Sequence, residues 1–183
     1  MQDMIITISG DVGSGKSTVA KIIAKKLGFK HYSTGDFMRS MAKEKKISLM
    51  QLGRLAEKSR TIDKELDERQ KKLGMEKDSF VIDSRLGFHF IPNSKKVYLK
   101  VNDEIAAERI FSSKRDDEKY NLTLRKTLDN IKERRKSEIM RYKKYYGINL
   151  MDLKNYDIVI DTSDITAEEA ADRIIKFVKQ KAL

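Results

Sequence analysis

The chain has 183 residues, 39% of them hydrophobic and 37% charged, which fits one globular domain and leaves little room for a second. The absence of cysteine excludes disulfides, thiolate nucleophiles and zinc–cysteine sites, and no apolar run approaches the roughly 20 residues of a membrane helix. Lys and Arg outnumber Asp and Glu by 39 to 28, and the formal charge of +11 favours polyanionic partners. Such a partner is either nucleic acid or the phosphates of a substrate in an active site. The third alternative, a solvated lysine-rich surface, explains most of the lysines.

The first predicted element is a strand at residues 4–9, a short apolar and β-branched run that is typical of burial on both faces. Met1 leads directly into this segment without the pattern of a signal peptide, so we expect a cytoplasmic protein. An amphipathic helix follows, in which Val19, Ile23 and Leu27 recur at helical spacing and Gly28 stands at the expected C-cap.

Between this strand and this helix, residues 10–17 read Gly-Asp-Val-Gly-Ser-Gly-Lys-Ser and match the phosphate-binding pattern G-x-x-x-x-G-K-S/T. Glycines allow backbone N–H groups to converge on the phosphates, and the helix N-terminus adds a favourable dipole. Lys16 is predicted to reach the β- and γ-phosphates of ATP, and Ser17 to ligate Mg²⁺. The alternative, a glycine-rich turn that binds nothing, is disfavoured by this context. The predicted ATP-binding residues of the loop are Gly10, Asp11, Val12, Gly13, Ser14, Gly15, Lys16, Ser17 and Thr18.

Strand and helix periodicities then alternate, which predicts an α/β fold with a parallel sheet and crossover helices. Further strands are expected at residues 80–83, 97–101 and 158–161. Residues 35–77 are helical and polar and are expected to form an insertion on the rim of the sheet.

Three more helices are expected in the second half of the chain. Asn102 or Asp103 caps one that runs through Arg109, and residues 121–146 form a long basic helix. Thr166 and Glu169 form a capping box for the last helix.

Several arginines lie where a second anion would bind, at the carboxyl ends of predicted strands and at helix starts. Arg39, Arg85 and Arg109 are of this kind, and Arg85 comes just after the strand at 80–83. On the long helix one face carries Arg134, Glu138, Arg141 and Tyr145. Another face, expected to pack on the sheet, carries Leu124, Leu128, Ile131, Ile139, Tyr142 and Tyr146. For each arginine a solvated ion pair is the alternative.

Asp83 ends an apolar strand, where a carboxylate is costly unless it meets a metal or a hydrogen-bond donor. We interpret it as a residue that holds Mg²⁺ through its water shell, with a strand-end cap as the alternative. The sequence offers no convincing general base, which a hydroxyl acceptor would need and a phosphate acceptor would not. His31 and His89 are interpreted as hydrogen-bonded structural residues.

These segments together resemble the archaeal-type cytidylate kinases. The resemblance rests on the glycine-rich loop, on Ser-Thr-Gly-Asp-Phe-Met-Arg at 33–39, Ile-Asp-Lys-Glu-Leu-Asp-Glu-Arg-Gln at 62–70, Val-Ile-Asp-Ser-Arg-Leu at 81–86, and the segments at 141–148 and 156–163. It covers nearly the whole chain, and the order and spacing of the segments carry it. Ser84 stands where the family usually has glycine.

The resemblance implies a three-layer P-loop NTPase fold with a five-stranded parallel sheet. It maps the core to 1–34, 78–110 and 123–183, a helical NMP-binding insertion to about 35–77 and a mobile lid to about 111–122. It implies that Thr34, Arg39, Arg69 and Arg85 hold the acceptor nucleotide, and Gln70 lies in the same family segment as Arg69. It further implies that Arg109 and Arg115 contact ATP, and that Arg134 and Arg141 neutralise the transferring group beside Lys16 and Arg85.

The expected reaction is transfer of the γ-phosphoryl group of ATP, with Mg²⁺, to CMP or dCMP. The alternatives are a kinase for another monophosphate, AMP first, and a P-loop assembly ATPase that binds RNA through its basic surface. Because aromatic residues make up only 8% of the chain and no RNA-reading module is visible, we expect no nucleic-acid partner. We also expect no membrane association and a monomer.

Overall fold

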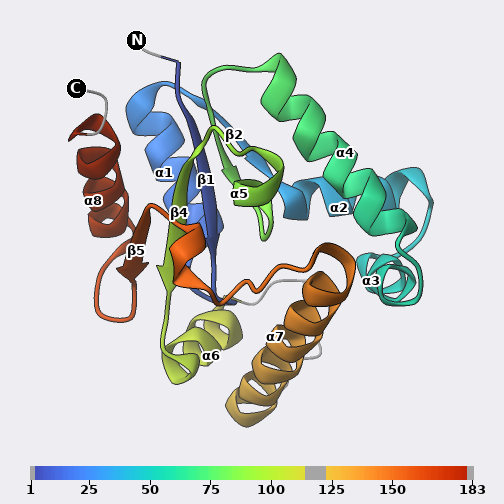
Figure 1. Cartoon of the computed structure of the whole chain (residues 1–183). Helices are drawn as coiled ribbons and strands as arrows, with labels where there is room; N and C mark the ends of the chain where they lie inside the picture. The colour runs from blue at the N-terminus through green and yellow to red at the C-terminus, as the bar shows by residue number, and fades with distance from the viewer. Residues whose placement is uncertain (1–2, 114–122, 181–183) are drawn as a thin grey trace.

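The structure is a computed structural model that describes residues 3–113 and 123–180. Five strands form one parallel sheet in the order β2-β3-β1-β4-β5 (Figure 1). The strands are β1 (Ile5–Gly10), β2 (Lys30–Ser33), β3 (Phe80–Asp83), β4 (Lys95–Lys100) and β5 (Ile158–Asp161). The predicted α/β class, its parallel sheet and four of its strands are confirmed, with shifts of one or two residues at the ends of β1 and β4.

β2 is the strand that the sequence pattern did not locate. It lies at the edge of the sheet and pairs only with β3, from Lys30 opposite Phe80 to Ser33 opposite Asp83. An edge strand of four residues with one fully buried side chain has no apolar run to reveal it.

α1 (Lys16–Leu27) and α8 (Ala167–Gln180) cover one face of the sheet and pack against each other. Their apolar sides meet the buried strand residues in the main core, which includes Ile6, Ile8, Val19, Ile23 and Ile174. Both predicted helix signals are confirmed. Gly28 ends α1 in the left-handed conformation, with φ of 70°, and Thr166 and Glu169 exchange hydrogen bonds ahead of α8.

The insertion consists of α2 (Thr34–Glu44), α3 (Leu49–Lys58) and α4 (Thr61–Glu76), on the right of the sheet in Figure 1. It has a small core of its own around Met41, Leu52 and Ile62. Residues 35–77 are helical as expected, and α4 leads directly back into β3.

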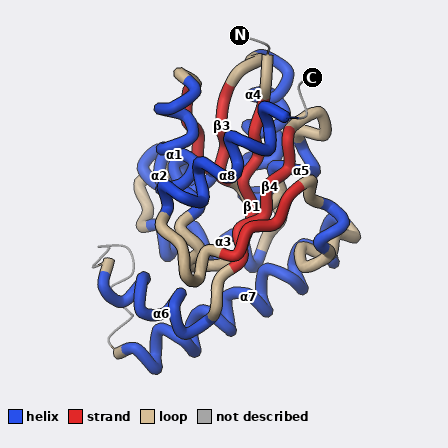
Figure 2. The backbone as a smooth tube through the Cα atoms, turned by 90° about the vertical axis from the view of Figure 1, so that its left-hand side faces the viewer, coloured by secondary structure: helices blue, strands red, loops and turns tan. Residues whose placement is uncertain are grey.

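α5 (Gly87–Phe90), α6 (Asp103–Ser112), α7 (Leu124–Tyr146) and the 3₁₀ turn η2 (Leu153–Asn155) complete the fold. Figure 2 shows α6 and α7 side by side beneath the strands. Asn102 caps α6 by accepting hydrogen bonds from two backbone N–H groups, and Thr123 caps α7, which begins three residues later than expected. No helix within 3–113 or 123–180 is long and apolar enough to span a membrane.

The apolar face of α7 does not simply pack on the sheet, as the sequence pattern had suggested. Leu128 and Ile131 pack against α6, whereas Tyr142 and Tyr146 join an aromatic cluster with Tyr98 of β4. Leu124 is exposed. The helix therefore lies across the carboxyl edge of the strands, where its polar face reaches the glycine-rich loop. Of the predicted lid, residues 114–122 lie outside the described residues.

Candidate active site

The glycine-rich loop connects β1 to α1 through a conformation that requires glycine. Gly10, Gly13 and Gly15 have φ of 145°, 80° and 79°. A Cβ atom on Gly10 would lie 2.2 Å from the carbonyl oxygen of Leu99, and one on Gly13 would lie 2.7 Å from the Cβ of Ala106. The loop is therefore closely packed against β4 and α6, and its shape depends on the absence of side chains at two positions.

Asp11 anchors this loop to β4. One of its carboxylate oxygens accepts a hydrogen bond from the Tyr98 hydroxyl at 2.9 Å, and the other accepts one from the backbone N–H of Val101 at 3.1 Å. At the other end of the loop, the Thr162 hydroxyl donates to the carbonyl of Ser14 at 3.2 Å. The carboxyl ends of β4 and β5, which lie on the same side of β1, thus hold both ends of the loop.

Lys16 lies at the start of α1 with its ammonium group folded back over the loop. Its Nζ donates to the carbonyl oxygens of Gly10, at 3.1 Å, and Asp11. Burial lowers the pKa of Lys16 well below its ordinary value, and the positive charge of Arg85 lowers it further. The ammonium group is therefore buried against the loop with Arg85 near it, where an anion would favour its charged form.

Ser17 and Asp83 meet beside the loop, as predicted for the metal-binding pair. The Ser17 hydroxyl donates to Asp83 Oδ1 at 3.1 Å, and the Ser33 hydroxyl donates to the same oxygen at 3.0 Å. The other oxygen, Oδ2, lies 2.8 Å from Nε2 of His31. His31 is thus a partner of the predicted metal-binding carboxylate, through its position on β2.

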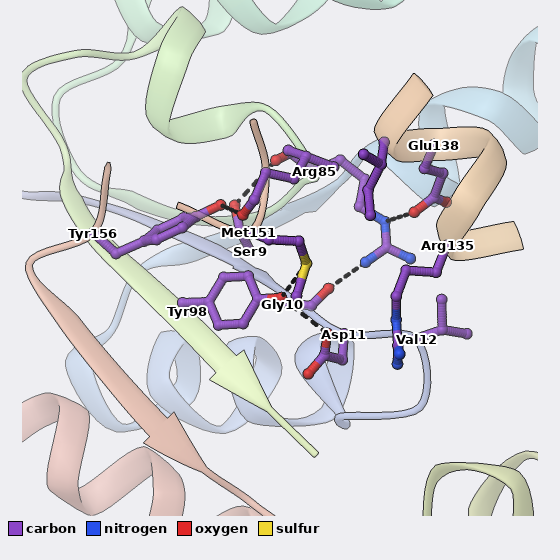
Figure 3. A pocket seen from close by; sticks show the side chains of 12 residues that line it. Ser9, Gly10, Asp11, Val12, Arg85, Tyr98, Arg135, Glu138, Met151 and Tyr156 are labelled. Carbon is purple, nitrogen blue, oxygen red and sulfur yellow. Dashed lines mark hydrogen bonds and ion pairs between the residues drawn. The ribbon is translucent and has the colours of Figure 1, made fainter. Parts of the chain in front are cut away.

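Arg85, Arg134 and Glu138 form an ion network above the loop, and Figure 3 shows the contact between Arg85 and Glu138. Arg85 donates through Nη1 to the carbonyl of Gly10 and lies 3.0 Å, through Nε, from Glu138 Oε2. Arg134 Nε donates to the other oxygen of Glu138 at 3.1 Å. Burial would raise the pKa of Glu138, but the guanidinium groups of Arg85 and Arg134 outweigh it and hold this pKa below its ordinary value. Glu138 therefore stays ionised and fixes both arginines at the loop.

Arg141 lies one turn of α7 further along and faces the insertion. Its Nε is 3.7 Å from Oδ2 of Asp63 on α4, its Nη2 donates to the Tyr142 hydroxyl at 3.2 Å, and its guanidinium lies 5.0 Å from the centre of that ring. The predicted catalytic set is therefore partly assembled. Lys16, Arg85 and Arg134 converge, while Arg141 faces α4 of the insertion.

The residues expected to hold the acceptor lie around the start of α2 and on α4. The Thr34 hydroxyl donates to the backbone carbonyl of Asp83 at 3.4 Å. Arg39 is half-exposed and pairs with Asp36 one turn earlier. Arg69 is held by Glu44 and Glu65, carboxylates of the insertion itself, at 2.9 and 3.0 Å.

Of the arginines expected to contact ATP, Arg109 lies over the segment that follows β5. Its guanidinium donates to the backbone carbonyls of Thr162 and Ser163, at 2.6 and 3.3 Å. Thr162 in turn donates to the carbonyl of Ser14 in the loop. Arg115 lies outside the described residues.

A small cavity of about 20 Å³, room for one water molecule, lies behind the loop. Its walls come from β1, β4, α7 and the segment before η2, and Figure 3 shows Arg85 and Tyr98 projecting into it. It is too small for a nucleotide.

Sequence reasoning missed several polar residues that the fold brings to the site. The anchoring role of Asp11 requires knowledge of the β1–β4 pairing, and that of His31 requires knowledge of β2. Asp63 and Asp67 line the buried side of α4 beside Gln70, which the resemblance had named, and their spacing of four and three residues was a signal available in the sequence.

Comparison of the sequence with known proteins shows which family the chain resembles. Residues 5–164 match the model of the family described as the Cytidylate kinase-like family. A cytidylate kinase of Methanocella arvoryzae is 40% identical over 177 residues, which cover 97% of this chain and 98% of the relative. A cytidylate kinase of Sulfurisphaera tokodaii is 39% identical over 91% of this chain and 90% of the relative. An S-adenosylmethionine-dependent nucleotide dehydratase of Lacinutrix mariniflava is 41% identical over 93% of this chain, but the match spans only 35% of that longer protein.

Solved structures support the fold. A shikimate kinase of Bacteroides thetaiotaomicron superposes with a TM-score of 0.67 at 14% identity, covering 96% of this chain and 98% of that one. At such identity the likeness concerns the fold alone, which is that of the P-loop kinases.

Proposed function

The chain belongs to the cytidylate kinase-like family, and from this premise we propose that it transfers the γ-phosphoryl group of ATP to CMP or dCMP, giving ADP and CDP or dCDP. The observation that carries the proposal is the convergence of Lys16, Arg85 and Arg134 on one side of the glycine-rich loop. Bringing two phosphate anions together requires positive charge that is fixed before they arrive.

A phosphate acceptor suits the carboxylates at this site better than a hydroxyl acceptor. The oxygens of Asp83 are already taken by two hydroxyls and His31. The arginines lower the pKa of Glu138, which makes that carboxylate a weak proton acceptor. The second pKa of a monoester phosphate is near ~6, so the acceptor is already an anionic nucleophile at neutral pH. The attacking oxygen then needs alignment and charge neutralisation but no general base.

The basic residues of the site have separate roles in this proposal. Lys16 neutralises the β- and γ-phosphates of the donor, and Arg85 and Arg134 neutralise the group in transit. Arg141, with Thr34 and Arg39, holds the phosphate and sugar of the acceptor. Arg69 supports this role indirectly, since it fixes α4 to α2 through Glu44.

Arg109 is assigned to the donor nucleotide. Its guanidinium is fixed to the backbone after β5, next to the residue that hydrogen-bonds the loop at Ser14. A planar cation at this position can stack on the adenine base, and Arg115 remains assigned to ATP by the family pattern.

Mg²⁺ fits the oxygen donors beside the loop. Ser17 offers a hydroxyl and Asp83 a buried carboxylate, 3.1 Å apart, and hard oxygen donors are the ligands that Mg²⁺ prefers. Because Asp83 already contacts Ser33 and His31, we assign it to the water shell of the metal and Ser17 to direct ligation. The bound metal would neutralise the donor phosphates.

The experiment is a coupled assay of ADP formation over CMP, dCMP, UMP, AMP, GMP and dTMP, with ATP and Mg²⁺. We expect turnover with the cytidine nucleotides and its loss in Lys16→Ala, with Lys21→Ala, an exposed lysine of the same helix, as control. Turnover with none of the monophosphates contradicts the proposal, and turnover confined to AMP establishes a different kinase.

A further inference from the structure

The buried side of α4 is polar, which is unusual for a helix that packs against its own domain. Asp63, Asp67 and Gln70 follow one another at spacings of four and three residues and are 5%, 7% and 3% exposed. Burial raises the pKa of Asp63 above its ordinary value and raises that of Asp67 to about 6. Both carboxylates therefore destabilise the fold in their ionised form. Such groups are seldom buried without a partner, which suggests that they serve a purpose other than stability.

The partners of these carboxylates leave hydrogen-bonding capacity unused. Asp63 Oδ2 is buried and makes no hydrogen bond to any residue in the described parts of the chain. The guanidinium of Arg141 faces it at 3.7 Å, and Arg141 Nε has no hydrogen-bond partner there either. Asp67 accepts one hydrogen bond, from the Tyr146 hydroxyl at 2.6 Å. A buried carboxylate has room for about four hydrogen bonds, so this pair is equipped to accept more.

The position of the pair is on the acceptor side of the site. Gln70 receives a hydrogen bond from the hydroxyl of Ser84, the residue between Asp83 and Arg85 at the end of β3. Arg141 stands between Asp63 and the network around Glu138. A nucleotide whose phosphate meets Arg85 and Arg141 would therefore extend its base along α4.

Resting on the kinase function proposed above, we propose that Asp63 and Asp67 recognise the acceptor base by accepting hydrogen bonds from the exocyclic amino group of cytosine. An amino group has two N–H donors, and two carboxylates offer acceptors for both. Uracil presents a carbonyl oxygen at the same position, which would place acceptor against acceptor in a buried site and is strongly disfavoured. Adenine also carries an amino group, so its exclusion would depend on the size of the site.

The competing explanation is that the pair only braces α4 against α7, through Arg141 and Tyr146. Bracing would affect all acceptors equally, because it would alter the position of the insertion and not the contacts to one base. The two explanations therefore differ in selectivity between bases, and not in overall activity.

The test compares kcat/KM for CMP, UMP and AMP, and KM for ATP, in Asp63→Asn, Asp67→Asn and the wild type. Glu68→Gln is the control, since Glu68 lies on the same helix, is exposed and pairs with Lys71. An amide can donate to the uracil carbonyl, so we expect kcat/KM for CMP to fall by about 10–100-fold and the CMP-to-UMP ratio to fall by at least tenfold. KM for ATP should stay within about twofold, since the donor site is unaltered.

Tyr146→Phe separates recognition from bracing without altering a carboxylate. It removes the hydroxyl that donates to Asp67 across the contact between α4 and α7. Bracing therefore predicts an equal fall in kcat/KM for CMP and UMP in this variant, whereas recognition predicts that both values stay within about twofold of the wild type. An unchanged ratio in both aspartate variants, or an equal fall for CMP and UMP, overturns the inference. A wild type that phosphorylates no monophosphate overturns the kinase function instead, so the two failures are distinct. If either aspartate variant does not fold, an equal fall in kcat/KM for CMP and UMP in Tyr146→Phe also overturns the inference.

Discussion

The Nε atom of Arg85 lies 3.0 Å from Oε2 of Glu138, a contact that joins the end of β3 to the middle of α7. Both side chains are mostly buried, at 17% and 13% exposed. Since Arg85 also donates to the carbonyl of Gly10, this ion pair fixes a cation against the phosphate-binding loop. Glu138 is thus a positioning residue, and the sequence alone suggested only that it shares a face with arginines.

Glu138→Gln should lower kcat/KM by about 10–100-fold. The amide keeps the shape of the side chain, but its charge no longer holds Arg85 and Arg134 together, and both guanidinium groups lose their fixed orientation. Steady-state kinetics over the acceptor concentration measures the effect. Glu133→Gln, an exposed position on the same helix, should leave kcat/KM unchanged, and an equal loss in both variants would mean that α7 itself was disturbed.

Arg85→Lys should lose activity nearly as severely as Arg85→Ala, by about 10²–10³-fold in kcat. Arg85 reaches the carbonyl of Gly10 and the carboxylate of Glu138 with different nitrogens of one planar group. A lysine ammonium on a flexible stem cannot hold both contacts in that geometry. Near-normal kcat in Arg85→Lys would show that charge alone is sufficient at this position.

Gly10→Ala should destabilise the protein by about 3 kcal/mol and abolish ATP binding. The added methyl group would lie 2.2 Å from the Leu99 carbonyl oxygen, at a φ of 145°. Urea unfolding gives the free energy of unfolding, and a fluorescent ATP analogue gives the binding. Gly53→Ala is the control, since Gly53 lies in α3 with open space around it, and it should stabilise the protein by about 0.5–1 kcal/mol.

Asp67→Asn should stabilise the protein at neutral pH, in a way that depends on pH. The carboxyl group has a pKa of about 6 in the folded protein and 3.8 as its ordinary value, so the folded state holds a proton that the unfolded state releases between these values. Stability due to this group is therefore present below pH ~4 and is lost as pH rises to ~6. The free energy of unfolding of Asp67→Asn should equal that of the wild type near pH 4 and exceed it by about 1–2 kcal/mol at pH 7.

Unfolding in urea at a series of pH values measures this difference, with Glu68→Gln as the matched variant. A difference that does not vary between pH 4 and 7 would show that the carboxylate is not destabilised by burial. If Asp67→Asn both stabilises the protein and impairs selectivity for cytosine, the carboxylate lowers stability at α4 while it serves recognition of the base.

Local patterns predicted the parts of the site that are contiguous in the chain. The loop at 10–17, the strand before Asp83 and the caps at Gly28 and Thr166 are each defined by neighbours within a few residues. For the same reason the position of Arg85, two residues after a buried strand, led to its prediction as a site residue.

Contacts between distant segments were not predictable in this way. The pairing of Glu138 with Arg85, of Asp63 with Arg141 and of Tyr146 with Asp67 depends on the angle at which α7 crosses the strand ends. The sequence shows that a helix is amphipathic but not which element covers each face, and this explains why α7 packs on α6 where the sheet was expected.

The most direct test of the kinase function uses ATP labelled at its γ-phosphate, with CMP as the acceptor and Mg²⁺ present. The measurement is the amount of label that is transferred to CMP. The account predicts labelled CDP as the product of the wild type and its absence in Lys16→Ala. Label released only as inorganic phosphate, with CMP unchanged, would contradict the account and identify the chain as an ATPase.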